Sequence, residues 1–108
     1  ANITTYFTKV RKFIKANPKS FKGLAGEVQF LIKGPSPSEY VLNLNVNPPT
    51  VRKSKTADAV LSLTIQDVHL KKIEAGSLDY ESAMVQGRLV VTGDEELAKK
   101  IAGVMGQV

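Results

Sequence analysis

The side chains best suited to catalysis are spread along the chain without forming a recognisable reactive group. His69 is the single histidine, and it has no Ser and Asp or Glu pair at a spacing that would orient it. Asp67 and Glu74 show no pattern that would set them opposite each other as a general acid and base. Serines such as Ser36, Ser62 and Ser82 lack the turn of a nucleophile elbow. The sequence therefore predicts that the protein is not an enzyme.

Cofactor and metal sites are not predicted either. The chain has no cysteine, which removes disulfides, thiolate metal sites and thiol catalysis. Gly87 and Gly93 bracket an apolar segment and do not form a phosphate-binding loop. We expect no cofactor and no metal. The missing cysteine fits a reducing compartment, so we expect an intracellular protein in the cytoplasm or an organelle lumen.

Positive charge is the clearest feature of the composition. The 108 residues carry a formal net charge of +5 at pH 7, and basic side chains gather between residues 9 and 22. Such a surface attracts anionic partners. Nucleic-acid binding is not expected, because aromatic side chains do not alternate with the basic ones. Two interpretations stay open for one group of basic residues: they form a solvated face, or they dock transiently on anionic membranes. This group consists of Lys9, Arg11, Lys12 and Lys15.

An amphipathic helix is predicted at the start of the chain. Apolar residues recur at helical spacing, with the basic residues outside their arc, at Ile3, Tyr6, Phe7, Val10, Phe13 and Ile14. Asn2 or Thr4 is a candidate for the N-terminal cap, and Asn17-Pro18 ends the helix.

Apolar segments separated by turn residues predict five strands. Their expected ranges are 28–32, 40–46, 50–53, 57–65 and 88–92, and the third is a short edge strand. Residues 66–86 carry two short helices and are long enough for a crossover connection. Thr64 and Asp67 have the spacing of a capping box, with Asp in place of Glu. The predicted class is α+β, with a mostly antiparallel five-stranded sheet and helices covering one face.

The last helix has an apolar face wider than the usual stripe. The face consists of Leu97, Ala98, Ile101, Ala102, Val104 and Met105. Gly103 and Gly106 weaken the end of this helix. Two explanations stay open: a helix wedged between the sheet and a neighbouring helix, or a mobile wall of an apolar cavity.

A run of motifs between residues 58 and 101 is distinctive in its order and spacing. An acidic residue opens the strand Asp58-Ala-Val-Leu-Ser-Leu-Thr64, and a helical segment runs from Asp67 to Gly76. There follow Leu78-Asp79-x-x-x-Ala83-Met84, then Gln86-Gly87-Arg-Leu-Val-Val-Thr-Gly93-Asp94, and then Leu97-Ala98-Lys-Lys-Ile101. In this order the motifs resemble the sterol carrier protein type-2 (SCP-2) family. The resemblance extends more loosely over the first helix and residues 28–46.

The resemblance implies a five-stranded sheet with helices over one face and an apolar tunnel between them. It also implies a lipid carrier without chemistry, whose ligands are sterols, fatty acids, fatty acyl-CoAs or phospholipids. We expect one domain over residues 1–108, with a cavity lined by Ile65, Val68, Met84, Val85, Leu97, Ile101, Val104 and Met105. The chain ends in Gly106-Gln-Val108, so the peroxisomal Ser-Lys-Leu type of ending is absent from this sequence.

The alternative is an interaction or dimerisation module without a cavity. In that interpretation the wide apolar face of the last helix docks on a partner chain, and the domain is one end of a larger enzyme. Residues 97–105 serve both interpretations, and the sequence leaves the oligomeric state open.

Overall fold

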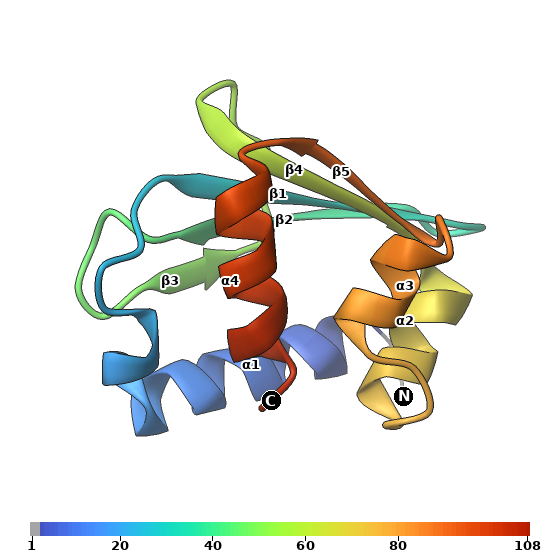
Figure 1. The fold of residues 1–108 in the computed structure, drawn as a ribbon, viewed down its shortest axis with the longest axis horizontal. Coiled ribbons are helices and arrows are strands. Elements are labelled where there is room, and N and C mark those ends of the chain that lie inside the picture. The colour runs from blue at the N-terminus through green and yellow to red at the C-terminus, as the bar shows by residue number, and fades with distance from the viewer. Residues whose placement is uncertain (1–2) are drawn as a thin grey trace.

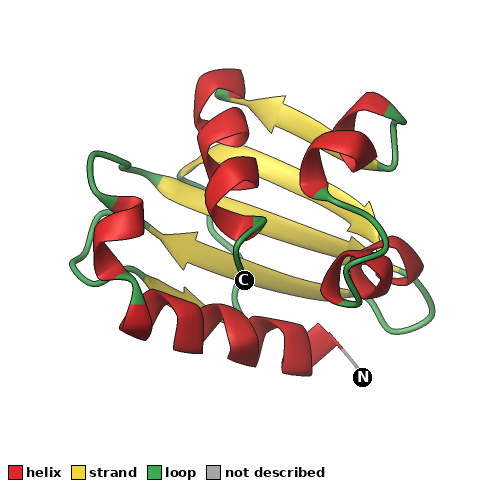
Figure 2. Ribbon diagram, turned by 60° about the horizontal axis from the view of Figure 1, so that its bottom comes forward, coloured by secondary structure: helices red, strands yellow, loops and turns green. Residues whose placement is uncertain are grey.

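A mixed sheet with helices on one face forms the fold (Figure 1). In the computed structural model, which describes residues 3–108, the strands are β1 (Glu27–Lys33), β2 (Ser38–Asn43), β3 (Thr50–Arg52), β4 (Ala59–Gln66) and β5 (Leu89–Gly93). The helices are α1 (Ile3–Ala16), a 3-10 helix η1 (Pro18–Phe21), α2 (Asp67–Glu74), α3 (Tyr80–Val85) and α4 (Glu95–Met105). Figure 2 shows the helices together on one side of the sheet, which confirms the predicted α+β class.

The strand order is β3-β2-β1-β4-β5, with β3 at one edge as predicted. β1 runs parallel to β4, whereas the other neighbouring pairs are antiparallel. The crossover predicted for residues 66–86 is wrong, because β5 pairs antiparallel with β4. Figure 1 shows α2 and α3 at the end of the sheet where β4 ends and β5 begins, so they turn the chain back instead of carrying it across.

The core lies between the sheet and the helices, and α1 contributes five of its side chains. The apolar stripe predicted for α1 is confirmed, since five of its six residues, Ile3, Tyr6, Phe7, Val10 and Ile14, are buried and Phe13 is partly buried against the core. Phe7 is at its centre, and its ring stacks on Tyr40 with the ring centroids 4.0 Å apart. Strand residues that alternate toward the helices complete the core, and they are Val28, Phe30, Ile32, Leu42, Leu61, Leu63, Ile65 and Leu89.

Two local predictions are corrected by the structure. The capping box at Thr64 is wrong, because β4 continues through Gln66 and that residue begins α2 without a side-chain cap. Ile65 is 2% exposed and pairs with Leu89 on β5, so sheet pairing and burial keep this segment extended. Val46 was expected to continue the second strand, but β2 ends at Asn43 and Val46 is exposed. The capping prediction for Asn2 lies outside the described residues.

A buried amide holds the long connection between β3 and β4 against the sheet. Gln29 alternates with the core residues of β1, so its side chain points to the face away from the helices, where it is 3% exposed. Its Nε2 donates to the carbonyl oxygens of Tyr40 at 3.0 Å and Ser54 at 3.2 Å. Its Oε1 accepts from the backbone N–H of Thr56 at 2.8 Å. One side chain thus joins β1, β2 and the connecting segment.

We predict that Gln29→Ala lowers the free energy of unfolding by about 3 kcal/mol, because it leaves buried backbone groups without partners at ~1–3 kcal/mol each. Urea unfolding of both proteins measures the change. Gln86→Ala is the control, since Gln86 is exposed and a surface change of this kind costs no more than ~0.5 kcal/mol. A loss below about 1 kcal/mol for Gln29→Ala would show that the amide does not hold the connection.

Candidate functional site

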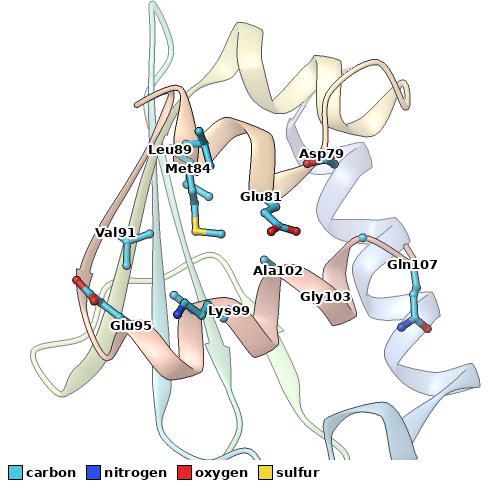
Figure 3. A pocket seen from close by; sticks show the side chains of 13 residues that line it. Asp79, Glu81, Met84, Leu89, Val91, Glu95, Lys99, Ala102, Gly103 and Gln107 are labelled. Carbon is cyan, nitrogen blue, oxygen red and sulfur yellow. The ribbon is translucent and has the colours of Figure 1, made fainter.

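Helix α3 forms the first wall of the site, and a side-chain cap fixes where it begins. Asp79 is the N-cap, and its Oδ1 accepts the backbone N–H of Ser82 at 2.7 Å. Hydrogen bonding from Ser82 holds the pKa of the Asp79 carboxyl below its ordinary value. Tyr80 and Ala83 anchor the helix in the core. Met84 therefore lies partly exposed along the side of α3, facing α4 (Figure 3).

Strand β5 forms the floor of the site. It follows α3 closely because the chain turns at Gly87. Gly87 has φ +74°, and the next backbone N–H, of Arg88, returns to the carbonyl oxygen of Ala83 at 2.9 Å. The turn places Leu89 and Val91 on the helix side of the sheet, where Leu89 is buried and Val91 partly buried.

Helix α4 is the second wall. Asp94 is its N-cap, with Oδ1 accepting the backbone N–H of Leu97 at 3.0 Å. Glu95 and Glu96 in the first turn suit the positive end of the helix dipole. The residues that α4 buries are Leu97, Ala98, Ile101 and Met105. The predicted helix and its acidic first turn are both present.

Between these three elements lies a groove of about 770 Å³. This is within the usual range for small-molecule sites, roughly 300–1,000 Å³. Its apolar lining comprises Met84, Val85, Leu89, Val91, Ala98 and Ala102. Polar groups form the rim, namely Asp79, Glu81, Glu95, Lys99 and Gln107. In Figure 3, Met84 and Glu81 extend from α3 into the gap that separates it from Ala102 on α4.

The eight residues predicted to line a cavity fall in different places. Met84 and Val85 line the groove. Ile65, Leu97 and Ile101 are buried in the core and do not line it. Val68 is exposed on α2, away from the groove lining. Val104 lines a neighbouring pocket, and Met105 lines a second cavity, to which α1 contributes Tyr6 and Lys9. A closed tunnel stays a prediction, since the space between α3, β5 and α4 is a groove.

Several lining residues were not anticipated from the sequence. Ala98 and Ala102 are four residues apart on α4, and their small side chains leave the space that α3 does not fill. Leu89 and Val91 alternate on β5, which is a signal that periodicity does contain. The groove is therefore built from small residues on one wall and apolar residues on the floor.

The basic residues of α1 have mixed environments. Lys9 Nζ lies 3.2 Å from Glu74 Oε2, and Arg11 Nε donates to the carbonyl oxygen of Val51 at 3.0 Å. Lys12 and Lys15 are exposed. None of the helices formed by residues 3–108 is both long and apolar enough to cross a bilayer. Any membrane contact of this helix would rest mainly on Lys12 and Lys15.

Two buried tyrosines lie beside the groove. The hydroxyl groups of Tyr6 and Tyr80 are in hydrogen-bond contact, and both residues are 2% exposed. Burial raises the pKa of Tyr6 well above its ordinary value, an effect that the bond to Tyr80 partly offsets and the Glu74 charge reinforces. Burial also raises the pKa of Tyr80. Both hydroxyls are therefore protonated at neutral pH.

The groove has the composition of a binding site. Its polar side chains are at the rim, and Asp79 is already used as a helix cap. Within residues 3–108 there is no group of three or more His, Cys, Asp or Glu side chains that could hold a metal ion. His69 Nδ1 is buried without a hydrogen-bond partner among the described residues and is not part of the groove lining.

Solved structures share this fold. Palmitated SCP2L2 from Aedes aegypti superposes with a TM-score of 0.86 at 21% identity, over 97% of this chain and 95% of the other. Sterol Carrier Protein-2 from Aedes aegypti, in complex with palmitate, gives a TM-score of 0.72 at 24% identity, over 93% and 90%. These likenesses establish the arrangement of helices and sheet.

Sequence comparison points the same way. Hydroxysteroid dehydrogenase-like protein 2 from Xenopus laevis is 30% identical over 95 residues, which are 85% of this chain. The chain spans 22% of the length of that relative. The model of the SCP-2 sterol transfer family matches residues 7–106, which include every element of the groove from α3 to α4. The chain therefore belongs to the SCP-2 sterol transfer family.

Proposed function

We propose that this domain binds a lipid in the groove between α3, β5 and α4 and transfers it without chemical change. The observation that carries the proposal is an apolar floor of Leu89 and Val91 within a space of about 770 Å³, ringed by polar side chains. That arrangement matches a molecule with a long apolar part and a small polar end. The palmitate bound to the two Aedes aegypti proteins of the same fold supports it.

Transfer without catalysis fits the groups that line the groove. Its polar residues include no nucleophile next to a base, and the charged side chains of Glu81, Glu95 and Lys99 are exposed. The relative from Xenopus laevis is named for a dehydrogenase, but this chain spans 22% of that protein. We therefore assign no dehydrogenase activity to this segment.

Chain length of the ligand should matter more than its detailed shape. Burial of an alkyl chain contributes ~0.8 kcal/mol per methylene group, and that contribution has no direction. Met84 is flexible and adapts to different apolar surfaces. We infer a site that accepts several long-chain lipids, in a protein that works inside the cell, in the cytoplasm or an organelle lumen.

The alternative function, an interaction module, would have little of the apolar face of α4 available for a partner in this structure. It requires the apolar face of α4 to be free, but Leu97, Ala98, Ile101 and Met105 are buried within the domain. Ala102 and Val104 are left partly exposed, and Ala102 lines the groove. The face packs mainly inside its own domain, which favours the carrier.

Filling the groove should prevent lipid binding. We predict that Ala102→Leu weakens the binding of a fluorescent fatty acid more than tenfold, because it displaces about two methylene groups of ligand at ~0.8 kcal/mol each. Fluorescence titration measures the affinity. Ala16→Leu, at the exposed end of α1, is the matched control and should bind normally. Normal affinity in Ala102→Leu would place the ligand elsewhere, and no saturable binding by the unchanged protein would refute the carrier function.

The C-terminal half of α4 should act as the movable wall. Gly103 has no positive φ, and a Cβ added there would meet no atom within 4 Å, so alanine fits without strain. We predict that Gly103→Ala slows ligand release, because it reduces the freedom of the unwound helix end. Amide exchange from about residue 100 onward should be faster in the free protein than in the lipid-bound one. Equal exchange in both states would contradict a gate at this end.

Docking on anionic membranes should depend on the free cations of α1. We predict that the double change Lys12→Glu and Lys15→Glu abolishes co-sedimentation with acidic vesicles, since each basic residue near such a surface contributes ~1 kcal/mol. Wild-type binding should weaken sharply at high salt. The pair Lys53→Glu and Lys71→Glu makes the same charge change at exposed positions outside α1 and is the control. Equal losses in the two double variants would show a general charge effect and no docking face.

A further inference from the structure

The two edges of the sheet differ in how well they are protected against further pairing. At one edge, β3 follows Pro48-Pro49 and carries the charged residue Arg52. Its Val51 carbonyl oxygen also accepts a hydrogen bond from Arg11 Nε at 3.0 Å. Proline, charge and covering side chains are the features that keep an edge strand from pairing again. At the other edge, β5 consists of Leu89–Gly93, which includes neither a charge nor a proline.

The pairing of β5 with β4 determines which backbone groups of β5 face outward. The N–H of Asp94 donates to the carbonyl oxygen of Val60 at 3.0 Å and continues the β4–β5 register by one residue. In an antiparallel ladder, residues bonded to the neighbouring strand alternate with residues whose N–H and C=O point away from it. Leu89, Val91 and Gly93 therefore direct their backbone groups away from β4. Within residues 3–108 these outward groups have no hydrogen-bond partner.

This set of outward groups is complementary to itself. A two-fold axis at Val91, the midpoint of the strand, places Val91 opposite its own copy and Leu89 opposite Gly93 of a second copy. Every such pair joins two outward-facing residues, so each N–H meets a C=O in the antiparallel pattern. The central pair also brings two β-branched side chains together across the strands, which stabilises a sheet.

The charges beyond the ends of β5 match in the same register. Arg88 of one copy lies opposite Asp94 of the second copy, and the two-fold axis repeats this pair at the other end. Arg88 takes part in none of the ion pairs formed within residues 3–108. Asp94 is exposed and caps α4 through Oδ1, so Oδ2 remains for a guanidinium. Opposite charges on facing strands favour pairing.

Exposed valines lie at this edge of the molecule. Val90 is 53% exposed, and Val85, the last residue of α3, is 85% exposed. Figure 1 shows α3 at the start of β5 and α4 at its end. In the two-fold register, the end of α3 in one copy therefore approaches the start of α4 in the other. Residues 84–87 carry no charge, so the approaching surface is not repelled by the acidic first turn of α4.

We propose that β5 pairs with β5 of a second copy of this chain and joins the two sheets into one. The proposal goes beyond lipid binding and does not depend on it. The two-fold axis is perpendicular to the sheet, so the helices of both copies lie on the same face and the two grooves are neighbours. The floor of each groove then continues into β5 of the second copy instead of ending at an edge. This contact uses β5 and not the apolar face of α4.

The dimer should be weak, because two paired strands of five residues bury less than the ~1,200 Å² of a stable interface. We expect a dissociation constant in the micromolar to millimolar range, measured by sedimentation equilibrium between ~10 μM and ~1 mM protein. Val91→Pro removes the central outward N–H and leaves the β4 ladder intact, because that N–H does not point toward β4. It should weaken association at least tenfold, the loss of about two hydrogen bonds per dimer.

A charge reversal tests the ends of the paired strands. Arg88→Glu sets two carboxylates opposite each other and should weaken the dimer about tenfold. Lys53→Glu makes the same change of net charge beside the protected edge, where Lys53 is exposed, and should leave association unchanged. Thermal unfolding and titration with a fluorescent fatty acid verify that each variant keeps its fold.

Disulfide cross-linking tests the register, and the absence of cysteine from the chain makes it specific. The register sets Val90 opposite Thr92 of the second copy as a non-hydrogen-bonded pair, with Cα atoms about 4.5 Å apart, a distance that a disulfide spans. Two copies of Val90 are diagonal neighbours at roughly 7–8 Å, which is too far. A mixture of the Val90→Cys and Thr92→Cys proteins should therefore cross-link at least fivefold faster than either alone. Val68→Cys, at an equally exposed valine of α2, is the control and should not cross-link.

Each result supports or overturns the β5 dimer. Concentration-dependent association that falls in Val91→Pro and Arg88→Glu, with preferential cross-linking in the mixture, supports it. A chain that stays monomeric to about 1 mM overturns it and leaves the β5 edge to a strand of a different protein. Association with no preference for the mixture, or with equal cross-linking of Val68→Cys, overturns it in favour of another surface. The cross-linking result decides if Val91→Pro unfolds. Lipid binding by a monomeric protein would leave the proposed function standing.

Discussion

The attachment of α4 to the backbone of β4 is the constraint on which the groove depends. The backbone N–H of Asp94 donates to the carbonyl oxygen of Val60 at 3.0 Å, just before the helix begins. Gly93, with φ +112°, has no side chain at this point, and a Cβ there would clash with the same carbonyl oxygen. The start of α4 is thus fixed on the sheet, and Ile101, which is fully buried, holds its middle. What α4 leaves uncovered between itself and α3 is the groove.

This attachment at one end gives the two ends of α4 different properties. The first turn is capped, carries favourable charges and is bonded to the sheet. The last turn carries Gly103 and ends at Gly106, which lines both the groove and the second cavity, the one that Met105 also lines. Glycine has the largest backbone entropy to lose on ordering, so the weaker end of the helix is the end where the two spaces meet. The groove therefore has one wall that is fixed at the sheet and less firmly held at its other end.

The elements were predictable from the sequence to a greater extent than the site. Helical spacing predicts the buried face of α1, and alternation predicts β4 and β5, because each of these elements has one buried and one solvent-exposed face. The direction of β5 was not predictable, since the length of residues 66–86 allows either a crossover or a return. The sequence pattern also does not show which residues of the wide apolar face of α4 pack in the core and which line the groove. Ile101 and Ala102 are adjacent in the sequence, but Ile101 packs in the core and Ala102 on the groove.

Small residues do not reveal themselves as groove walls in a sequence, for a physical reason. A large apolar side chain does not by itself mark a cavity wall, because it fills space when the core surrounds it, as Leu97 and Ile101 do. A groove persists where side chains are too short to reach across, which is the role of Ala98 and Ala102. Recognising this needs the distance between α3 and α4, and that distance follows from the turn at Gly87 and the attachment at Gly93.

The net charge of the chain and the charge around the groove have opposite signs. The whole sequence is +5, whereas the groove rim holds three carboxylates against one ammonium group. On the other side of α4, a pocket of about 420 Å³ carries Lys22, Lys99 and Lys100 and no acidic residue. Long-range attraction follows the total charge, but a bound head group senses the groups within a few ångströms of it. The basic groups that give the chain its net charge are therefore largely separate from the mostly acidic groups at the groove rim, and each set can change without the other.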